Sequence, residues 1–140
     1  MAHIEEILAQ NGKCIAKTEG DSMYPLIVAG KHKVLITLPE FPLKKGDVPL
    51  YKRDDRYVLH RIVRVTKNGY VISGDNRGHA EKDITDKDIV GVLSGIYDGD
   101  KLLNSTDKAY IKHTKKVLRS YPTRRFNHLF TALINKIKSR

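Results

Sequence analysis

The sequence contains one cysteine, no tryptophan and no charge-free stretch of about 18 residues, the length that a membrane-spanning helix needs. We therefore expect no transmembrane helix. Glu5 and Glu6 interrupt the one early apolar cluster, so we also expect no secretory signal. Cys14 cannot form an intramolecular disulfide, and we expect a buried small side chain rather than a reactive thiol. These absences predict a protein that is cytoplasmic or peripherally associated with a membrane.

Patterns for metal or cofactor binding are also missing. A chain of 140 residues can bury a hydrophobic core without help from a metal. The glycines are scattered singly and form no phosphate-binding loop. Five histidines besides His60 show no paired ligand spacing: His3, His32, His79, His113 and His128. We expect neither a metal nor a cofactor.

Acidic residues are scarce in one part of the chain. Residues 101–140 hold 11 Lys and Arg but one acid, whereas residues 1–100 hold 15 of each sign. The whole net charge of +10 therefore lies in the C-terminal part. This asymmetry predicts a β domain over residues 1–100 and a basic helical extension over residues 101–140. An anionic partner would be met by the extension rather than by the domain.

Short runs of β-branched and aromatic residues follow one another after residue 13, separated by turn signals rich in Gly, Asn and Asp. Asn68-Gly69 between two runs is a strong hairpin signal. We predict a mainly β, antiparallel domain, preceded by a short helix over residues 2–10. The expected strands are Cys14–Thr18, Lys33–Leu38, Val48–Lys52, Tyr57–Thr66, Tyr70–Ser73 and Ile89–Tyr97.

The spacing of apolar residues becomes helical after residue 100, in two segments separated by Tyr121-Pro122. We therefore predict two basic amphipathic helices. The second carries one apolar stripe: Phe126, Leu129, Phe130, Leu133, Ile134 and Ile137. Its flanking cations are typical of a helix that lies on an anionic membrane, which predicts a membrane contact through residues 108–140. Two alternatives remain open, in which the stripe packs on the β domain or on a second copy of the chain.

Three short motifs can converge on one site. "EGDSMYPLI" places Ser22 in a turn, and "YVLHRIVRV" places His60 on a predicted strand. Alternation puts His60 and Arg61 on opposite faces of that strand. The hairpin at Asn68-Gly69 would bring Gly74-Asp75-Asn76 near the start of the same strand, within reach of His60 or Arg61. A serine hydroxyl becomes nucleophilic when a base takes its proton, and a third group can orient that base.

"GDSMYP", "LHRIV" and "SGDN", in this order and spacing, resemble the superfamily of serine peptidases that contains signal peptidase I and the LexA repressor, over Thr18–Leu93. The segment from Gly20 to Met23 resembles the LexA side, whereas Pro25 and the "GDN" box resemble signal peptidases. Most bacterial members have a lysine before the arginine. His60-Arg61 instead resembles the signal peptidases of the endoplasmic reticulum and archaea, and a subset of Gram-positive enzymes. The resemblance implies a LexA/signal-peptidase-like β fold and a Ser-His peptidase.

The resemblance also implies roles for single residues. Ser22 is the nucleophile, its backbone N–H contributes to the oxyanion hole, and His60 is the general base. Signal peptidases commonly have Ser-Gly-Ser where this chain has Gly-Asp-Ser, so an extra hydroxyl that can help to hold the oxyanion is missing. Arg61 and Asp75 support the site. The residues expected at the oxyanion hole and the substrate are Asp21, Ser22, Met23 and Pro25.

The catalytic acid is expected several residues beyond the "GDN" box. The segment "GDNRGHAEKD" offers Glu81 and Asp83, neither of them in the register of the family. We predict Asp83 rather than Glu81.

Three functions are open at this point. The first is a serine endopeptidase that cleaves a leader or signal-like peptide after a small residue, with the basic extension in place of a membrane anchor. The second is a self-cleaving repressor, which the 21 residues before Ser22 disfavour because they hold neither a helix-turn-helix nor an Ala-Gly bond. The third is a non-catalytic module whose extension binds anionic membrane or nucleic acid. We expect a peptide or preprotein as partner and disfavour nucleic acid, because the aromatic residues form no known RNA-binding signature.

Overall fold

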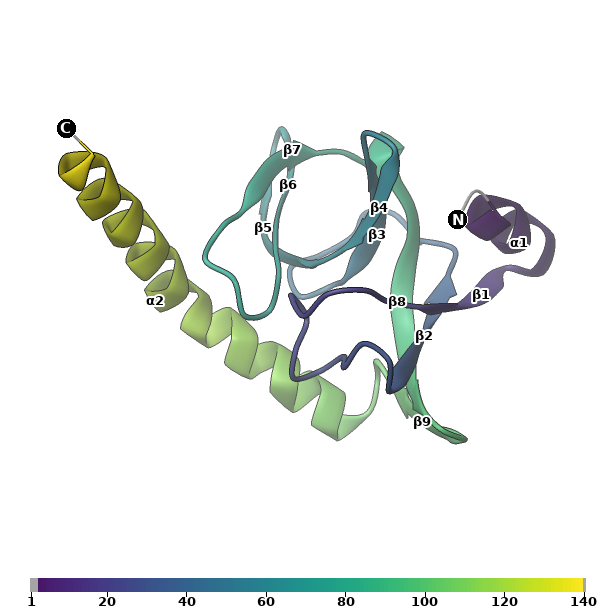
Figure 1. Ribbon diagram of the computed structural model, residues 1–140. Helices are drawn as coiled ribbons and strands as arrows, with labels where there is room; N and C mark the ends of the chain where they lie inside the picture. Colours follow the sequence, from purple (N-terminus) through teal and green to yellow (C-terminus); the bar gives the residue numbers. More distant parts are fainter. Residues whose placement is uncertain (1–2, 140) are drawn as a thin grey trace.

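The computed structural model describes residues 3–139, which form a β domain of two antiparallel sheets and a long C-terminal helix (Figure 1). The chain begins with helix α1 (His3–Asn11). The strands are β1 (Lys13–Lys17), β2 (His32–Thr37), β3 (Pro49–Arg53), β4 (Arg56–Leu59), β5 (Arg61–Thr66), β6 (Gly69–Ser73), β7 (Glu81–Ile84), β8 (Ile89–Asp98) and β9 (Lys101–Asn104). A single 3-10 turn (Asp86–Asp88) precedes β8, and helix α2 (Lys108–Lys138) ends the chain. The predicted fold class, a mainly antiparallel β protein with a short N-terminal helix, is confirmed.

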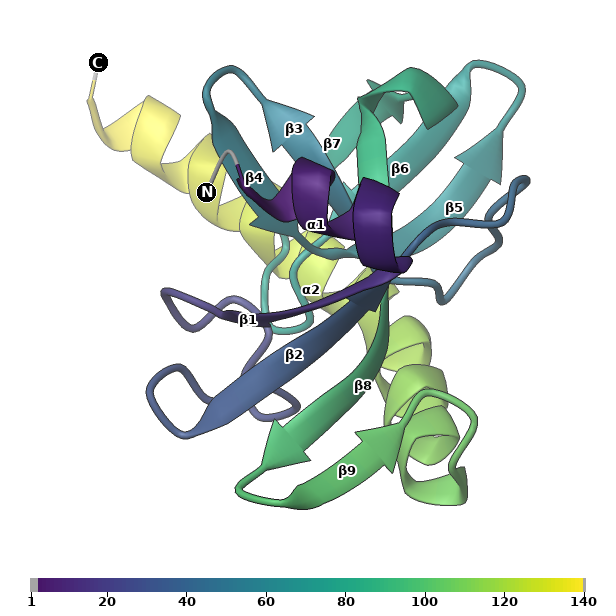
Figure 2. The same cartoon turned by 90° about the vertical axis from the view of Figure 1, so that its right-hand side faces the viewer.

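The larger sheet has the strand order β1-β2-β8-β3-β4, with β9 paired to β8. The smaller sheet has the order β5-β6-β7. Figure 2 shows α1 on one side of the sheets and α2 on the opposite side. The two edge strands of the main path, β1 and β4, each pair with one neighbour in the described part of the chain, and these strands lead into the turns that carry Ser22 and His60.

Two clusters of buried side chains form the core. The larger lies between α1, the larger sheet and the root of α2, from which Tyr110 is inserted. The smaller lies around the three-stranded sheet and includes Tyr51, Ile62 and Ile72. Cys14 is buried in the larger cluster, as expected of a small apolar side chain. Both clusters include side chains from the segments that carry Ser22 and His60.

The predicted strand Tyr57–Thr66 is wrong in one respect: it is two strands in two different sheets. Strand β4 ends at Leu59 and pairs with β3, whereas β5 begins at Arg61 and pairs with β6. His60 is the residue at which the chain passes from one sheet to the other. The expected alternation therefore fails, and Arg61, Ile62 and Val63 are all buried. The hairpin at Asn68-Gly69 forms as predicted, with Thr66 opposite Gly69.

Two strands are absent from the sequence prediction. Strand β7 reads Glu-Lys-Asp-Ile and β9 reads Lys-Leu-Leu-Asn. Both are four residues long and mostly exposed, so they lack the β-branched and aromatic composition that marks a strand. Their partners β6 and β8 supply the hydrogen bonds that hold them.

The predicted pair of C-terminal helices is also wrong, because α2 is one helix of 31 residues that continues through Pro122. A proline lacks the N–H that would bond the carbonyl four residues earlier. The carbonyl that loses its backbone donor is that of Leu118. The neighbouring Val117 carbonyl accepts hydrogen bonds from Ser120 Oγ and from Arg124 Nη1. No helix within residues 3–139 has the length and hydropathy to cross a membrane.

Candidate active site

The turn after β1 holds Ser22 at the surface of the larger core. Gly20 has a positive φ of 76°, which glycine adopts without steric cost. The turn closes through a hydrogen bond from Tyr24 N to Asp21 O at 3.0 Å. Met23 and Ile27 are buried, and they anchor the turn in the core. Ser22 directly precedes Met23 and remains partly accessible.

Ser22 Oγ lies 2.9 Å from Nε2 of His60, at the point where the chain leaves β4 for β5. Burial lowers the pKa of His60 below its usual value of 6.5, against the opposing charges of Glu81 and Asp75. A neutral imidazole can accept the proton of the serine hydroxyl through its unprotonated nitrogen. The pair therefore has the distance and the protonation state that general-base activation requires.

Arg61 and Asp75 form a buried ion pair directly behind this pair. Arg61 Nε donates to Asp75 Oδ1 at 2.7 Å and Nη2 donates to Oδ2 at 3.0 Å, with side chains 0% and 1% exposed. Such a two-point pair fixes both groups in orientation as well as distance. Arg61 Nη1 also donates to the carbonyl of Gly46 at 2.9 Å. A buried charge without these partners would be strongly destabilising.

Helix α2 takes part in the same network. His113 Nε2 lies 2.8 Å from Asp75 Oδ2, and Arg61 Nη1 donates to Thr114 Oγ1 at 2.7 Å. The ring of Tyr110 lies 5.9 Å from the guanidinium carbon of Arg61. Burial tends to raise the pKa of Asp75, but hydrogen bonds from His113 and Arg61 outweigh it and hold that pKa below its usual value. Asp75 is therefore an anion at neutral pH, shared between the β domain and α2.

A second turn, just after β6, grips the serine turn. Asn76 Nδ2 donates to the Asp21 carbonyl at 2.7 Å and to the Tyr24 carbonyl at 3.2 Å, on either side of Ser22. The Asn76 N–H donates to the Ser22 carbonyl at 3.3 Å. A Cβ on Gly74 would lie 2.8 Å from that carbonyl oxygen, so only glycine allows the two turns to approach this closely. The backbone N–H of Ser22 has no hydrogen-bond acceptor within residues 3–139, and it is free to serve an oxyanion.

The other residues expected near the oxyanion hole and the substrate lie in three different settings. Asp21 is exposed, and its Oδ1 lies 2.5 Å from Nη2 of Arg77. Met23 is 5% exposed and belongs to the core, so its side chain supports the turn from below. Pro25 is exposed beside the turn.

The structure does not bring Asp83 to His60. Asp83 is exposed in β7 with a positive φ of 62°, and within residues 3–139 no hydrogen bond joins it to His60. The charge of Glu81, by contrast, acts to raise the pKa of His60 against the effect of burial. Its carboxylate accepts a hydrogen bond from the Tyr51 hydroxyl at 2.8 Å and pairs with Arg53 Nε at 2.7 Å. The Tyr51 and His60 rings meet edge to face, 6.5 Å apart, so Tyr51 links Glu81 to the histidine.

Sequence reasoning missed Tyr51, His113 and Thr114. A signal for the helix residues was present, since Tyr110, His113, Thr114 and Val117 follow the spacing of one helix face. The spacing identifies a buried helix face only if the polar side chains of His113 and Thr114 are assumed to point inward. They face inward because the β domain offers each a buried partner: Asp75 for His113 and Arg61 for Thr114.

This arrangement pairs a hydroxyl with a neutral base and leaves a free N–H beside it, which is how serine hydrolases form a nucleophile and hold an oxyanion. A family model described as Peptidase S24-like matches residues 2–94, more than half of the chain. The chain belongs to the Peptidase S24-like family. No curated protein and no solved structure matches it. The match ends before α2, which lies outside the part that the family defines.

Proposed function

We propose that this protein is a serine endopeptidase in which Ser22 is the nucleophile and His60 the general base. The observation that carries the proposal is the 2.9 Å contact between Ser22 Oγ and His60 Nε2, inside a chain of the Peptidase S24-like family. The lowered pKa of His60 supports it, because the base is unprotonated at neutral pH. The buried pair Arg61–Asp75 supports it by anchoring the residue that follows His60 in the chain.

The reaction follows the ordinary course of acyl transfer. Ser22 Oγ attacks the scissile carbonyl while His60 Nε2 takes its proton, and the N–H of Ser22 donates to the oxyanion. The tetrahedral intermediate collapses, His60 gives the proton to the leaving amine, and an ester joins the substrate to Ser22. Water, deprotonated by His60, then attacks the ester. As the ester bond breaks, His60 returns this proton to Ser22 Oγ, and the acid product leaves and ionises in solvent.

The substrate class that fits best is an extended leader or signal-like segment cleaved after a small residue. An extended peptide can add to an open sheet edge through backbone hydrogen bonds. Strands β1 and β4 are the edges of the larger sheet, and they lead directly to Ser22 and His60. The small residue is the preference that the resemblance to signal peptidases implies. The His60-Arg61 pair, rather than lysine and arginine, supports the Ser-His type of that superfamily.

The proposed location is the cytoplasm or a membrane surface. The cations of α2 support the second of these.

Cleavage mapping tests the proposed function. A library of unstructured peptides is incubated with the wild type, Ser22→Ala and His60→Ala, and the products are identified by mass spectrometry. We expect cuts after small residues with the wild type and none with either variant, while circular dichroism shows all three folded. Ser105→Ala, a serine in the turn after β9, is the matched control and should cleave like the wild type. Cleavage that persists in Ser22→Ala would refute the assignment.

The second candidate is a non-catalytic member of the fold that binds an anionic surface through α2. The concentration of 11 Lys and Arg in residues 101–140 is the observation that favours it. The same experiment decides between the two, because this alternative predicts no cleavage by the wild type.

A further inference from the structure

The distal half of α2 exposes five large apolar side chains: Phe126, Leu129, Phe130, Leu133 and Ile137. Phe126 is 66% exposed and Ile137 is 59% exposed. The rings of Phe126 and Phe130 stack with centroids 6.1 Å apart, so the apolar surface is continuous along the helix. A soluble surface rarely keeps such a patch without a function.

The β domain cannot cover this stripe, because the opposite side of α2 faces the domain. Tyr110 and Val117 are buried on that side, and Arg124 and Arg125 donate to the carbonyls of Arg77 and Gly78. Figure 1 shows the C-terminal turns of α2, in yellow, running away from the sheets. Packing of the stripe on the chain's own β domain is therefore not observed.

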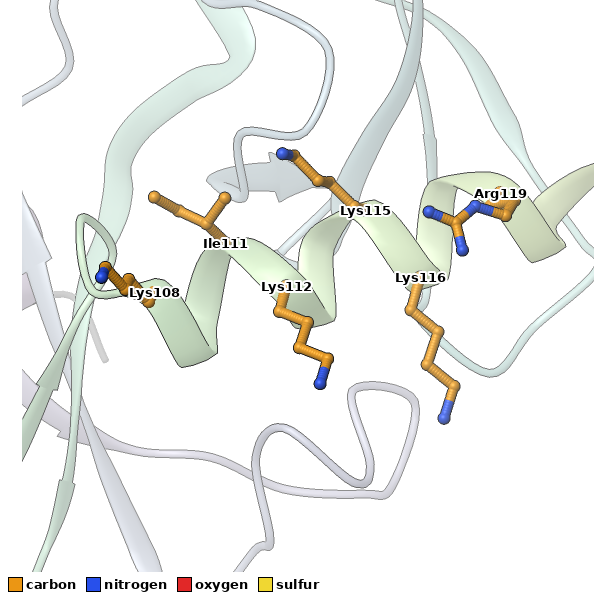
Figure 3. A pocket seen from close by; sticks show the side chains of 6 residues that line it. All are labelled: Lys108, Ile111, Lys112, Lys115, Lys116 and Arg119. Carbon is orange, nitrogen blue, oxygen red and sulfur yellow. The ribbon is translucent and has the colours of Figure 1, made fainter.

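The proximal half of the same face is basic. Lys108, Lys112, Lys115 and Arg119 follow one another at intervals of four, three and four residues, which keeps them on one side of a helix. Seven residues after Arg119 the same intervals place Phe126, Phe130, Leu133 and Ile137 on the continuation of that line. Figure 3 shows the side chains of this part of α2, which include Ile111 among the cations.

We propose that this face of α2 docks on an anionic lipid membrane. A helix lying flat on a bilayer can bury the apolar half at the boundary of headgroups and acyl chains while the basic half meets lipid phosphates. A second copy is a poorer occupant, since antiparallel helices would bring the lysine-rich halves against apolar ones and parallel helices would bring like charges together. A nucleic acid matches the basic half but leaves five apolar side chains in water.

Docking of this kind fixes where the catalytic site sits. The side of α2 turned away from the lipid holds Asp75 through His113 and the Gly78 turn through Arg125. The β domain therefore stands on the helix, with Ser22 a short distance above the bilayer. This step rests on the proposed function, and it makes lipid-tethered peptides better substrates than free ones.

Vesicle sedimentation with the full chain tests the docking itself. The probes are vesicles of phosphatidylcholine alone, and vesicles of phosphatidylcholine and phosphatidylglycerol in equal parts. We expect binding to the anionic vesicles only, reduced about tenfold in Phe130→Ser, because burying a phenyl ring is worth about 1.5–3 kcal/mol. Each of Lys112→Gln and Lys115→Gln should reduce it about fivefold. Phe41→Ser and Lys33→Gln remove an exposed ring and an exposed cation from the β domain and should leave it unchanged.

Three outcomes would overturn the proposal: no binding to anionic vesicles, tighter binding to an oligonucleotide than to vesicles, or a dimer in sedimentation velocity that Phe130→Ser abolishes. A second assay separates this proposal from the proposed function. The same peptide is offered free and anchored in anionic vesicles through an acyl chain. Phe130→Ser should match the wild type on the free peptide and lose about tenfold on the anchored one. If the wild type cleaves neither, the peptidase proposal fails while vesicle binding still tests the docking.

Discussion

His113 in helix α2 lies 2.8 Å from Oδ2 of Asp75, the carboxylate that also holds Arg61 beside the candidate base. An element outside the family match therefore completes the support of the site. Arg61 is wholly buried, so its positive charge must be compensated, and Asp75 provides the opposite charge. The orientation of Asp75 depends in part on His113. The C-terminal helix is thus a structural component of the candidate site as well as an exposed surface.

Replacing His113 tests this dependence. His113→Ala removes one hydrogen bond to a buried carboxylate, and bonds to charged groups contribute about 1.5–3 kcal/mol. We expect kcat to fall about tenfold with little change in KM. His113→Gln keeps a side-chain N–H donor and should recover part of the rate. His3→Ala, an exposed histidine in α1, serves as control. Equal kcat values in all three variants would contradict a positioning role.

The pH dependence of cleavage follows from the state of His60. Only the neutral imidazole accepts the proton of Ser22, and burial lowers the pKa of His60 from 6.5. The value of kcat/KM should therefore be constant above pH 6.5. It should fall about tenfold per pH unit once the pH is below the lowered pKa of His60.

The same shift has a consequence for folding. A group whose folded-state pKa is lowered contributes stability above its unfolded pKa, and this contribution is lost as the pH falls below 6.5. Circular dichroism at each pH is therefore the control for the rate profile. A rate that stays constant at pH values where NMR titration shows the His60 ring to be protonated, in folded protein, would exclude His60 as the base.

The third member of the site is decided by comparing two acids. The charge of Glu81 raises the pKa of His60, so Glu81→Gln should move the acid limb of the profile to lower pH. Asp83→Asn should leave the limb in place, because Asp83 is exposed and asparagine also tolerates a positive φ. The pKa of His60 is read from the NMR titration of its ring protons. Loss of cleavage in Asp83→Asn alone would instead restore the acid predicted from the sequence.

Asn76 should matter for rate more than for binding. Its carboxamide donates to the carbonyls of Asp21 and Tyr24 and so holds Ser22 in place. Asn76→Ala should lower kcat about tenfold, the effect of losing about 1.4 kcal/mol of positioning. Asn127→Ala, in an exposed position of α2, is the matched control. A variant with wild-type kcat and a raised KM would mean that Asn76 contacts substrate rather than the serine turn.

Much of the fold was predictable because turn signals and β-rich runs alternate clearly, and the Asn68-Gly69 hairpin fixed the neighbourhood of Asp75. The change of sheet at His60 was not predictable, because the alternation of side chains assumes that a strand stays in one sheet. The continuation of α2 through Pro122 was not predictable either. The proline removes one backbone hydrogen bond, but contacts with the β domain hold the helix on both sides of it, through the buried Val117 and through the hydrogen bond from Arg124 to the Arg77 carbonyl. The role of His113 needed the folded structure, since 38 residues separate it from Asp75.

The unbroken course of α2 makes the orientation of the whole protein a matter of helical phase. One uncharged residue added between Arg119 and Phe126 would turn everything beyond it by about 100° without altering the net charge. The apolar side chains would then no longer continue the line of basic ones. They would also no longer lie on the helix face opposite the contact with Asp75. In the proposed docked state, the number of residues between Arg119 and Phe126 therefore sets the angle at which Ser22 faces the membrane.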